Sequence, residues 1–315
     1  MSAVDPPRPP ILLHVGYHKT GSSWLQRRVF ASPESGFAWL GRPWQARQQI
    51  IAPHPLAFDP AVARAHYQAE IERAQAGGRI VVFSDERFSG NPHSGGYDSK
   101  ENAQRLAATF PEARILLVIR RQPEMLRSAY DQYVDEGGAC SIRDYLQPPR
   151  TRLAMPSFRF EHFEYHRLIE HYQQLFGRER VLVLAFEQFR ANGGRFLQSI
   201  MEFAGNASSF VADPDERVNA GRPAVLTALQ RRLNPFLVRD DLNGYSILAL
   251  PNGRRILQPL LVAAAKVAPR AWNEKAASRL RVEIERRCVG RYEASNARTA
   301  LLSDLPLRSL GYALT

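Results

Sequence analysis

The chain carries Gly16-Tyr17-His18-Lys19-Thr20-Gly21-Ser22-Ser23-Trp24 directly after the apolar run 11–15 and directly before the helix-like segment 25–30. This order predicts a strand, a glycine-bounded loop and the start of a helix. Backbone N–H groups at the start of a helix point toward the preceding loop, and the helix dipole adds partial positive charge there. The stretch therefore predicts a binding site for an anion such as a phosphate.

The lysine of this loop is displaced from its usual place. Gly16 and Gly21 occupy the two glycine positions of the phosphate loop GxxxxGK[ST], but Ser22 stands where that motif has lysine. In the ATPase loop the lysine reaches the terminal phosphates and the next hydroxyl binds magnesium. With the cation at Lys19 and two hydroxyls at the helix start, we expect the loop to bind one phosphate and direct Lys19 at the bond beyond it. A Gly/Ser-rich turn that merely caps a helix is the simpler alternative.

The stretch resembles the 5′-phosphosulfate loop of sulfotransferases that use 3′-phosphoadenosine 5′-phosphosulfate (PAPS), which is Lys-x-Gly-(Thr/Ser)-(Thr/Ser)-Trp. The matching residues are Lys19, Gly21, Ser22, Ser23 and Trp24. The resemblance implies that these residues and Thr20 bind PAPS, and that Lys19 is also catalytic. It further implies that Trp24 stacks on the adenine, whereas a place in the hydrophobic core is the alternative for this side chain.

A second motif follows a later apolar run. Residues 114–119 predict a strand buried on both faces, with Arg120 at its end and a helix that begins near Pro123. Ligands of open α/β sheets bind at the carboxyl ends of the strands. Sulfotransferases bind the 3′-phosphate with an arginine at a strand end and a serine eight residues later, and Arg120 and Ser128 have this spacing. Solvated surface positions are the alternative for both.

Two carboxylates follow the predicted strand 79–84. Transfer of a sulfuryl group to a hydroxyl requires a base near the acceptor oxygen. Glycan-modifying sulfotransferases have a glutamate after a central strand, in a Glu-Lys-(Thr/Ser) stretch, and Glu86 is similar in position although Arg87 replaces the lysine. The resemblance implies that Glu86 is the catalytic base. The alternatives are Asp85 and three histidines: His54, His93 and His162.

A late basic loop is the remaining candidate for the site. The family has a glycine-containing loop that closes over the 3′-phosphoadenosine, and Arg222 lies in the comparable stretch 219–223, which lacks the Arg-Lys-Gly of the cytosolic enzymes. Arg222 is therefore a candidate donor-binding residue, with an ordinary loop before a helix as the alternative. Glu187, after the last predicted strand, is expected to have a structural role.

The rest of the chain alternates between strand and helix patterns. Strands are predicted at 11–15, 37–40, 79–84, 114–119 and 180–185, and helices at 22–31, 60–76, 99–110, 123–136, 141–147, 158–176 and 192–204. This alternation predicts βαβ units and a parallel sheet covered by helices. Together with the loop it indicates an α/β fold like that of the P-loop NTPases.

The last third of the chain has a helical pattern from residue 222 onward. We expect four prolines to interrupt it: Pro235, Pro251, Pro259 and Pro269. The predicted organisation is a flexible leader over 1–10 and one sulfotransferase domain over 11–315. That domain would consist of an α/β core to about residue 205 and a helical extension over 206–315.

Composition limits the classes of function. The chain has 315 residues, a formal charge of +11 and two cysteines, which predict neither a disulfide framework nor a zinc site. No apolar run reaches the roughly 18 residues of a transmembrane helix, and no signal peptide is evident, so a cytoplasmic location is expected. The positive charge calls for an acidic partner. No nucleic-acid-binding motif is present, so a phosphate-rich small molecule is favoured.

These observations predict an enzyme that transfers a sulfuryl group from PAPS to an acceptor hydroxyl, expected to be on a carbohydrate, with the bisphosphate nucleotide PAP as product and without a metal ion. A P-loop kinase is one alternative, but it would need a lysine at position 22, which is Ser22. A non-catalytic nucleotide-binding or nucleic-acid-binding protein is the other, and it would need neither Lys19 nor Glu86.

Overall fold

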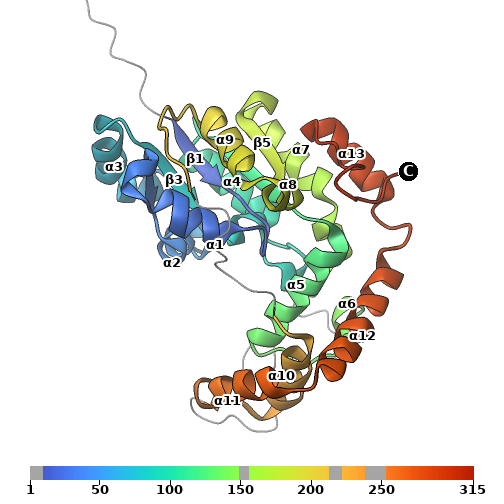
Figure 1. Ribbon diagram of the computed structural model, residues 1–315. Helices are drawn as coiled ribbons and strands as arrows, with labels where there is room; N and C mark the ends of the chain where they lie inside the picture. Colours follow the sequence, from blue (N-terminus) through green and yellow to red (C-terminus); the bar gives the residue numbers. More distant parts are fainter. Residues whose placement is uncertain (1–9, 149–155, 213–221, 238–252) are drawn as a thin grey trace, which may run out of the picture.

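The computed structural model describes residues 10–148, 156–212, 222–237 and 253–315 (Figure 1). At its centre is a five-stranded sheet in the order β2-β3-β1-β4-β5, in which all neighbouring strands are parallel. The strands are β1 (Ile11–His14), β2 (Phe37–Leu40), β3 (Ile80–Ser84), β4 (Arg114–Ile119) and β5 (Val181–Ala185). The predicted parallel α/β sheet is confirmed. Most of the predicted leader lies outside the described residues.

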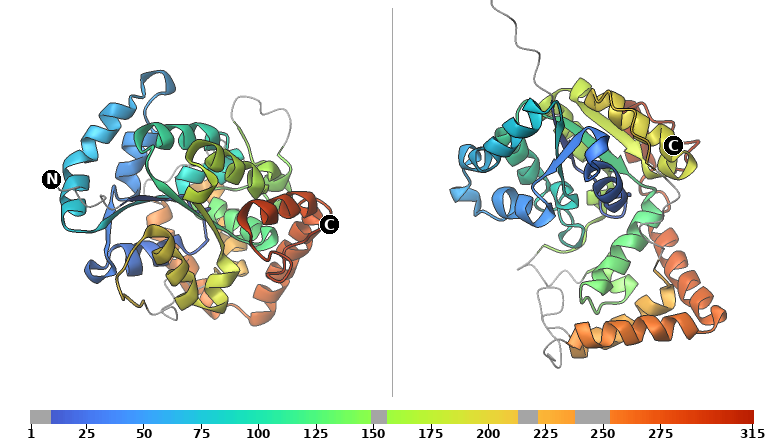
Figure 2. Two further views of the ribbon diagram at one scale, coloured as in Figure 1. Left: turned by 90° about the horizontal axis from the view of Figure 1, so that it is seen from above. Right: turned by 60° about the vertical axis from the view of Figure 1, so that its left-hand side comes forward.

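The sheet separates two hydrophobic layers, because successive side chains of a strand point to opposite faces. Leu12 belongs to the layer formed with α1 and α9. Its neighbour Leu13 belongs to the layer formed with α3, α4 and α7. Figure 2 shows helices on both sides of the sheet. The strands read as near-continuous apolar runs because both of their faces are buried.

The helices predicted up to residue 204 occur in the predicted order, with α2 and α8 in addition. They are α1 (Ser22–Trp24), which continues as a π-helical turn over Leu25–Phe30, α2 (Pro43–Ala46), α3 (Pro60–Ala76), α4 (Ser99–Thr109), α5 (Gln122–Asp135), α6 (Ile142–Leu146), α7 (Tyr165–Phe176), α8 (Phe186–Ala191) and α9 (Gly193–Ala204). Local signals set several ends. For example, the Asp59 carboxylate accepts a hydrogen bond from the Ala61 N–H at 2.8 Å and caps α3.

Three details differ from the sequence prediction. Helix α2 and the π-helical turn that follows it over Arg47–Ile51 were not predicted. The helix expected over 158–176 begins only at Tyr165, because Glu164 has the non-helical angles φ −81° and ψ 78° and separates α7 from a short turn over Phe160–Phe163. Helix α8 was not predicted. It forms directly after β5, where the Gln188 side chain accepts a hydrogen bond from the Ala185 N–H at 2.9 Å.

The C-terminal helices are α10 (Ala224–Leu237), α11 (Gly253–Val267), α12 (Arg270–Cys288) and α13 (Glu293–Ser303). Pro269 separates α11 from α12 as predicted, but Pro235 and Pro259 lie inside α10 and α11, so the expected interruptions there are wrong. Pro235 falls in the last turn of α10. Pro259 is exposed, so the carbonyl that it leaves unpaired can bond to water. Pro251 lies outside the described residues.

Only part of the C-terminal third extends away from the α/β body. Helices α10 and α11 lie beyond α5, whereas α13 returns to the body beside α7 (Figure 1). The C-terminal residues also pack on the body, with Leu307 and Tyr312 in its core. The division into an α/β core and a helical extension over 206–315 stays a prediction. In the described residues, no helix is both long enough and apolar enough to span a bilayer.

Candidate active site

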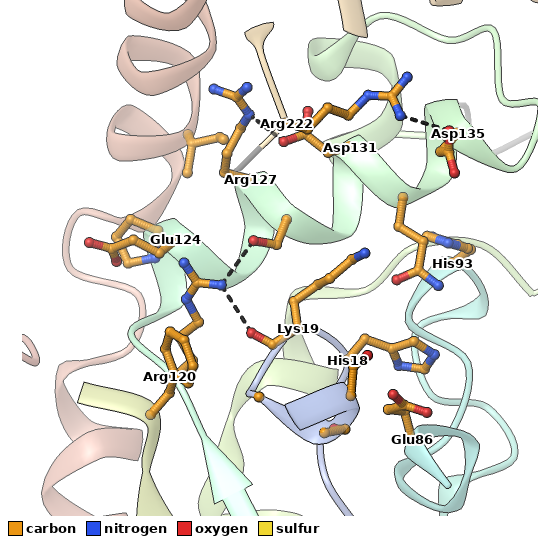
Figure 3. A pocket seen from close by; sticks show the side chains of 18 of the residues that line it. His18, Lys19, Glu86, His93, Arg120, Glu124, Arg127, Asp131, Asp135 and Arg222 are labelled. Carbon is orange, nitrogen blue, oxygen red and sulfur yellow. Dashed lines mark hydrogen bonds and ion pairs between the residues drawn. The ribbon is translucent and has the colours of Figure 1, made fainter. Parts of the chain in front are cut away.

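The loop between β1 and α1 has two residues in left-handed conformation. Gly21, which precedes the first helical residue, has φ 90°, and Lys19 has φ 64°. This conformation is uncommon for a residue with a side chain and persists where neighbouring contacts hold it. Here Thr20 Oγ1 donates to the Tyr17 carbonyl at 2.6 Å, and the Lys19 carbonyl accepts from Arg120 Nη1 at 3.0 Å. The Lys19 side chain is thereby left exposed in the pocket (Figure 3).

The inner side of the loop is tight and polar. A Cβ atom on Gly16 would lie 2.8 Å from His14 Nε2 and 3.1 Å from Ser22 Oγ, so only glycine fits there. Ser22 Oγ is buried and has no hydrogen-bond partner among the described residues. A buried hydroxyl without a partner is costly, which makes it a candidate contact for a ligand. His14 is a buried strand residue as expected. Its Nδ1 bonds to Ser84 Oγ at 2.7 Å, and burial lowers its pKa to about 3.

A cavity of about 1240 Å³ opens at the carboxyl ends of β1, β3 and β4. Parallel strands place their carboxyl ends at one edge of the sheet, so residues far apart in sequence meet there. Of the predicted site residues, all but Thr20 line this cavity: Lys19, Gly21, Ser22, Ser23, Trp24, Glu86, Arg120, Ser128 and Arg222. Thr20 is buried beneath the loop and bonds within it.

Arg120 joins the two predicted motifs. Its Nη1 donates to Ser128 Oγ at 3.1 Å as well as to the Lys19 carbonyl, as Figure 3 shows. Its guanidinium lies 4.9 Å from the ring centre of Phe186. Burial lowers the pKa of Arg120, and nearby Glu124 and Glu187 oppose that change; an arginine nevertheless remains charged in a protein. The neighbouring residue, Arg121, instead forms ion pairs with Glu124 and Glu187.

Glu86 lies at the cavity wall directly after β3. Burial raises the pKa of its carboxyl above the usual value, and the charge of Asp85 acts in the same direction, while Arg47 and Lys19 favour the ionised form. A half-buried carboxylate with a raised pKa, close to a lysine, has the properties of a general base near neutral pH. Glu86 was predicted for this role from its position after the strand.

Asp85 has a different environment. It is fully buried, and both of its carboxylate oxygens accept hydrogen bonds from Arg47, at 2.8 to 3.1 Å. One oxygen also accepts from the Arg87 N–H at 2.9 Å and so caps the turn that carries Glu86. Burial raises the pKa of Asp85, and its bonds to Arg47 oppose the rise. With these partners, Asp85 supports the Glu86 turn and is not available as a base.

The three alternative histidines have unequal positions. His54 is exposed and accepts a hydrogen bond from the Leu56 N–H, and it does not line the cavity. His162 is buried against the Tyr17 ring, and burial lowers its pKa to about 4. His93 does line the cavity, but its two ring nitrogens lie 3.0 Å from Tyr145 Oη and 3.3 Å from a Glu136 oxygen. Because it is the one of these three histidines that lines the cavity, His93 is the main alternative to Glu86 as the catalytic base.

The cavity is aromatic at one end. Trp24 is 4% exposed and belongs to the hydrophobic core, with its ring centre 4.7 Å from that of Phe189. Phe186 and Phe189, three residues apart on α8, complete this end, and a Cβ atom on Gly21 would lie 3.4 Å from the Phe186 ring. Trp24 therefore occupies a core position and is also one of the residues that line the cavity. Phe186 and Phe189 belong to no recognisable sequence motif.

The other end of the cavity is polar. It is lined by Arg47, Asn91, His93, Gln132 and Glu136. Burial alone would raise the pKa of Glu136, but hydrogen bonds from His93 and Gln132 lower it to about 2. Apart from His93, which was considered as a base, these residues come from segments without a recognisable motif and from the far end of α5, so the sequence contained no signal for them.

Arg222 has bonds within the protein. Its guanidinium donates to Asp135 at 2.7 Å, as Figure 3 shows. It also donates to Thr227 Oγ1 at 3.2 Å and to Gln230. The rest of the predicted late loop, up to Gly221, lies outside the described residues. Arg222 lines the cavity, so contact with a ligand would require it to exchange at least one of these partners.

No family model matches the chain, and neither does any curated protein. Among solved structures, one of a sulfotransferase from Alicyclobacillus acidocaldarius is similar, at 22% identity and a TM-score of 0.48 over 75% of this chain and 98% of that one. Another is the sulfotransferase domain of the olefin synthase from Synechococcus PCC 7002, at 16% identity and a TM-score of 0.34 over 87% and 95%. At these levels of similarity nothing about function follows from either.

Proposed function

We propose that this protein is a PAPS-dependent sulfotransferase that transfers a sulfuryl group to an acceptor hydroxyl on a carbohydrate. The observation that carries the proposal is the meeting of three predicted elements in one cavity: the Lys19 loop after β1, the Arg120–Ser128 pair after β4, and Glu86 after β3. The three elements are far apart in the sequence, and their common location supports the proposal.

The residues of the cavity fit a donor with two anionic groups and an aromatic base. Four of its described cations have no carboxylate partner: Lys19, Arg120, Arg190 and Arg281. The N-terminus of α1, together with Ser22 and Ser23, can bind the 5′-phosphate, and Arg120 with Ser128 can bind the 3′-phosphate. The aromatic end of the cavity can contain the adenine. The donor, when bound, supplies a sulfuryl group on a good leaving group.

The protein residues would then perform two tasks. Lys19 would stabilise the negative charge that develops on the departing bridging oxygen, which is an interaction strongest in the transition state. Glu86 would accept the proton of the attacking hydroxyl. The remaining residues would hold donor and acceptor in line, so that positioning contributes much of the catalysis.

The polar end of the cavity supports a carbohydrate acceptor. Its side chains offer amide, carboxylate, imidazole and guanidinium groups, which can form hydrogen bonds with several hydroxyls at once. An apolar acceptor such as a simple phenol would offer these groups few hydrogen bonds in place of those with water. A screen of sugars and phenols with radiolabelled donor tests the proposal. Transfer of label to none of them would contradict it.

The first prediction concerns recognition of the 3′-phosphate. Charge-assisted hydrogen bonds contribute roughly 1.5–3 kcal/mol each. We therefore expect Arg120→Ala to weaken binding of the bisphosphate nucleotide PAP about ten- to a hundredfold, while binding of the 5′-monophosphate changes little. Calorimetric titration with both nucleotides measures the two effects.

Arg121→Ala is the matched control, because Arg121 pairs with Glu124 and Glu187 and does not line the cavity. It should leave the affinity for PAP nearly unchanged. Equal losses for the two nucleotides in Arg120→Ala would show that Arg120 supports the loop in general and does not recognise the 3′-phosphate.

The second prediction distinguishes this activity from that of a kinase. P-loop kinases need magnesium to neutralise the charge of the phosphates. A sulfuryl group carries less charge, and Ser22 occupies the place of the P-loop lysine. We expect sulfuryl transfer to persist in the presence of EDTA. A complete loss that added magnesium reverses would support the kinase alternative.

A further inference from the structure

Helix α11 is apolar on two opposite faces. Leu261 and Ala265 are buried and form a small hydrophobic cluster with Val225 and Leu226 of α10. Yet the opposite face of α11 is also apolar, and it is exposed. A helix that is hydrophobic all round is ordinarily buried, in a protein core or in a membrane. The exposed face of α11 therefore needs an explanation.

The exposed side chains form a continuous line. Ile256, Leu260 and Val267 are 64%, 61% and 83% exposed. At 100° per residue these positions lie within about 40° of one another around the helix, and the line is roughly 16 Å long. Trp272, in the first turn of α12 and three residues after Pro269, is 64% exposed. We call this set of four side chains the α11 stripe.

Basic residues accompany the stripe. Lys266, Arg270, Lys275 and Arg279 are exposed in the same part of the chain. In the sequence, residues 253–279 contain six lysines or arginines and a single acidic residue, Glu274. An aliphatic line with a tryptophan at one end and basic neighbours is the pattern of helices that lie in the interface of an anionic bilayer.

We propose that the α11 stripe binds the surface of a membrane that contains anionic lipids. Charge distinguishes this partner from a second copy of the chain. A symmetric dimer through the stripe would bring two strongly basic surfaces together, whereas anionic headgroups would neutralise them. Nucleic acid would satisfy the charge but not the stripe, since aliphatic side chains offer bases little to stack on.

The position of α11 permits such contact. It lies at the end of the molecule away from the sheet, at the lower edge of Figure 1. None of its described residues lines the cavity, so a membrane at this face would leave the cavity open. Helix α12 connects the α11 stripe with the cavity, because its first turn carries Trp272 and its later residues Arg281 and Ile284 line the cavity.

Co-sedimentation of the full chain with lipid vesicles tests the proposal. We expect binding to vesicles of phosphatidylcholine mixed with phosphatidylglycerol, little binding to pure phosphatidylcholine, and release by salt. Leu260→Gln should weaken the partitioning roughly tenfold, because a leucine that enters the apolar layer contributes most of its transfer free energy. Lys266→Gln should weaken it about fivefold.

Leu301→Gln is the matched control, because Leu301 is a leucine of similar exposure, 68%, on α13. It should bind vesicles like the unaltered protein. Absence of binding to the anionic vesicles would overturn the proposal, and so would an equal loss in Leu301→Gln. A concentration-dependent dimer that Leu260→Gln abolishes would instead assign the stripe to a second copy of the chain.

Discussion

Lys19→Met is expected to lower turnover by about 10²–10³-fold, the range found when one group that stabilises transition-state charge is removed. Methionine is an unbranched side chain of similar length that lacks the charge and the hydrogen-bond donors of the ammonium group. Because the interaction would be made chiefly with the departing oxygen, affinity for the product nucleotide should fall far less than turnover. Single-turnover kinetics and a binding titration on the same preparation measure both quantities.

The backbone of Lys19 requires a control of its own. Its φ of 64° and the bond from Arg120 to its carbonyl mean that a variant could disturb the loop itself. Arginine is also a cation, and it would adopt the left-handed backbone conformation at position 19 at the same energetic cost as methionine. If the charge is what matters, Lys19→Arg should therefore retain more turnover than Lys19→Met. Turnover close to normal in Lys19→Met would exclude the proposed role of the ammonium group.

Glu86→Gln should reduce the rate by roughly 10²–10⁴-fold, which is the usual contribution of a positioned base. Glutamine keeps the shape of the side chain but cannot accept a proton at neutral pH. Nucleotide affinity should remain nearly intact, because Glu86 is assigned to the acceptor and not to the donor. Steady-state rates with saturating donor and acceptor provide the measurement.

The same assignment predicts a pH dependence. A base must be ionised, so activity should fall as the pH decreases through the pKa of Glu86. Burial raises that pKa above the ordinary value of 4.5, which places the acid limb of the profile at a higher pH than for an exposed glutamate. The residual activity of Glu86→Gln should lack this limb. Persistence of the limb in the variant would assign it to another group.

Asp85→Asn and His93→Gln are the comparison variants. Asp85 pairs with Arg47 and caps the Glu86 turn. Asp85→Asn should therefore lower the stability of the protein, but it should reduce the catalytic rate much less than Glu86→Gln does. His93 lines the cavity and is the rival base. If Glu86→Gln turns over almost normally while His93→Gln does not, the base is His93 and the similarity to glycan-modifying enzymes fails at this residue.

Much of the fold was accessible from the sequence because its signals are local. The central strands are buried on both faces and read as short runs of branched apolar residues, as in 114–119. Helix boundaries such as that of α3 coincide with Asp59 before the helix and Gly77 after it. The errors at Pro235 and Pro259 arose because a helix can continue through a proline when the surrounding structure tolerates the lost hydrogen bond.

By itself, the sequence determined the parallel sheet, the loop with its displaced lysine and the spacing of Arg120 and Ser128, because each depends on residues close together in the chain. Only the tertiary structure decided that Arg120 bonds to the carbonyl of Lys19, 101 residues away, and that Asp85 is neutralised by Arg47. It also decided the polar end of the cavity and the exposed face of α11. These features arise where remote segments meet or fail to meet, and no local pattern of residues records which segments will be neighbours.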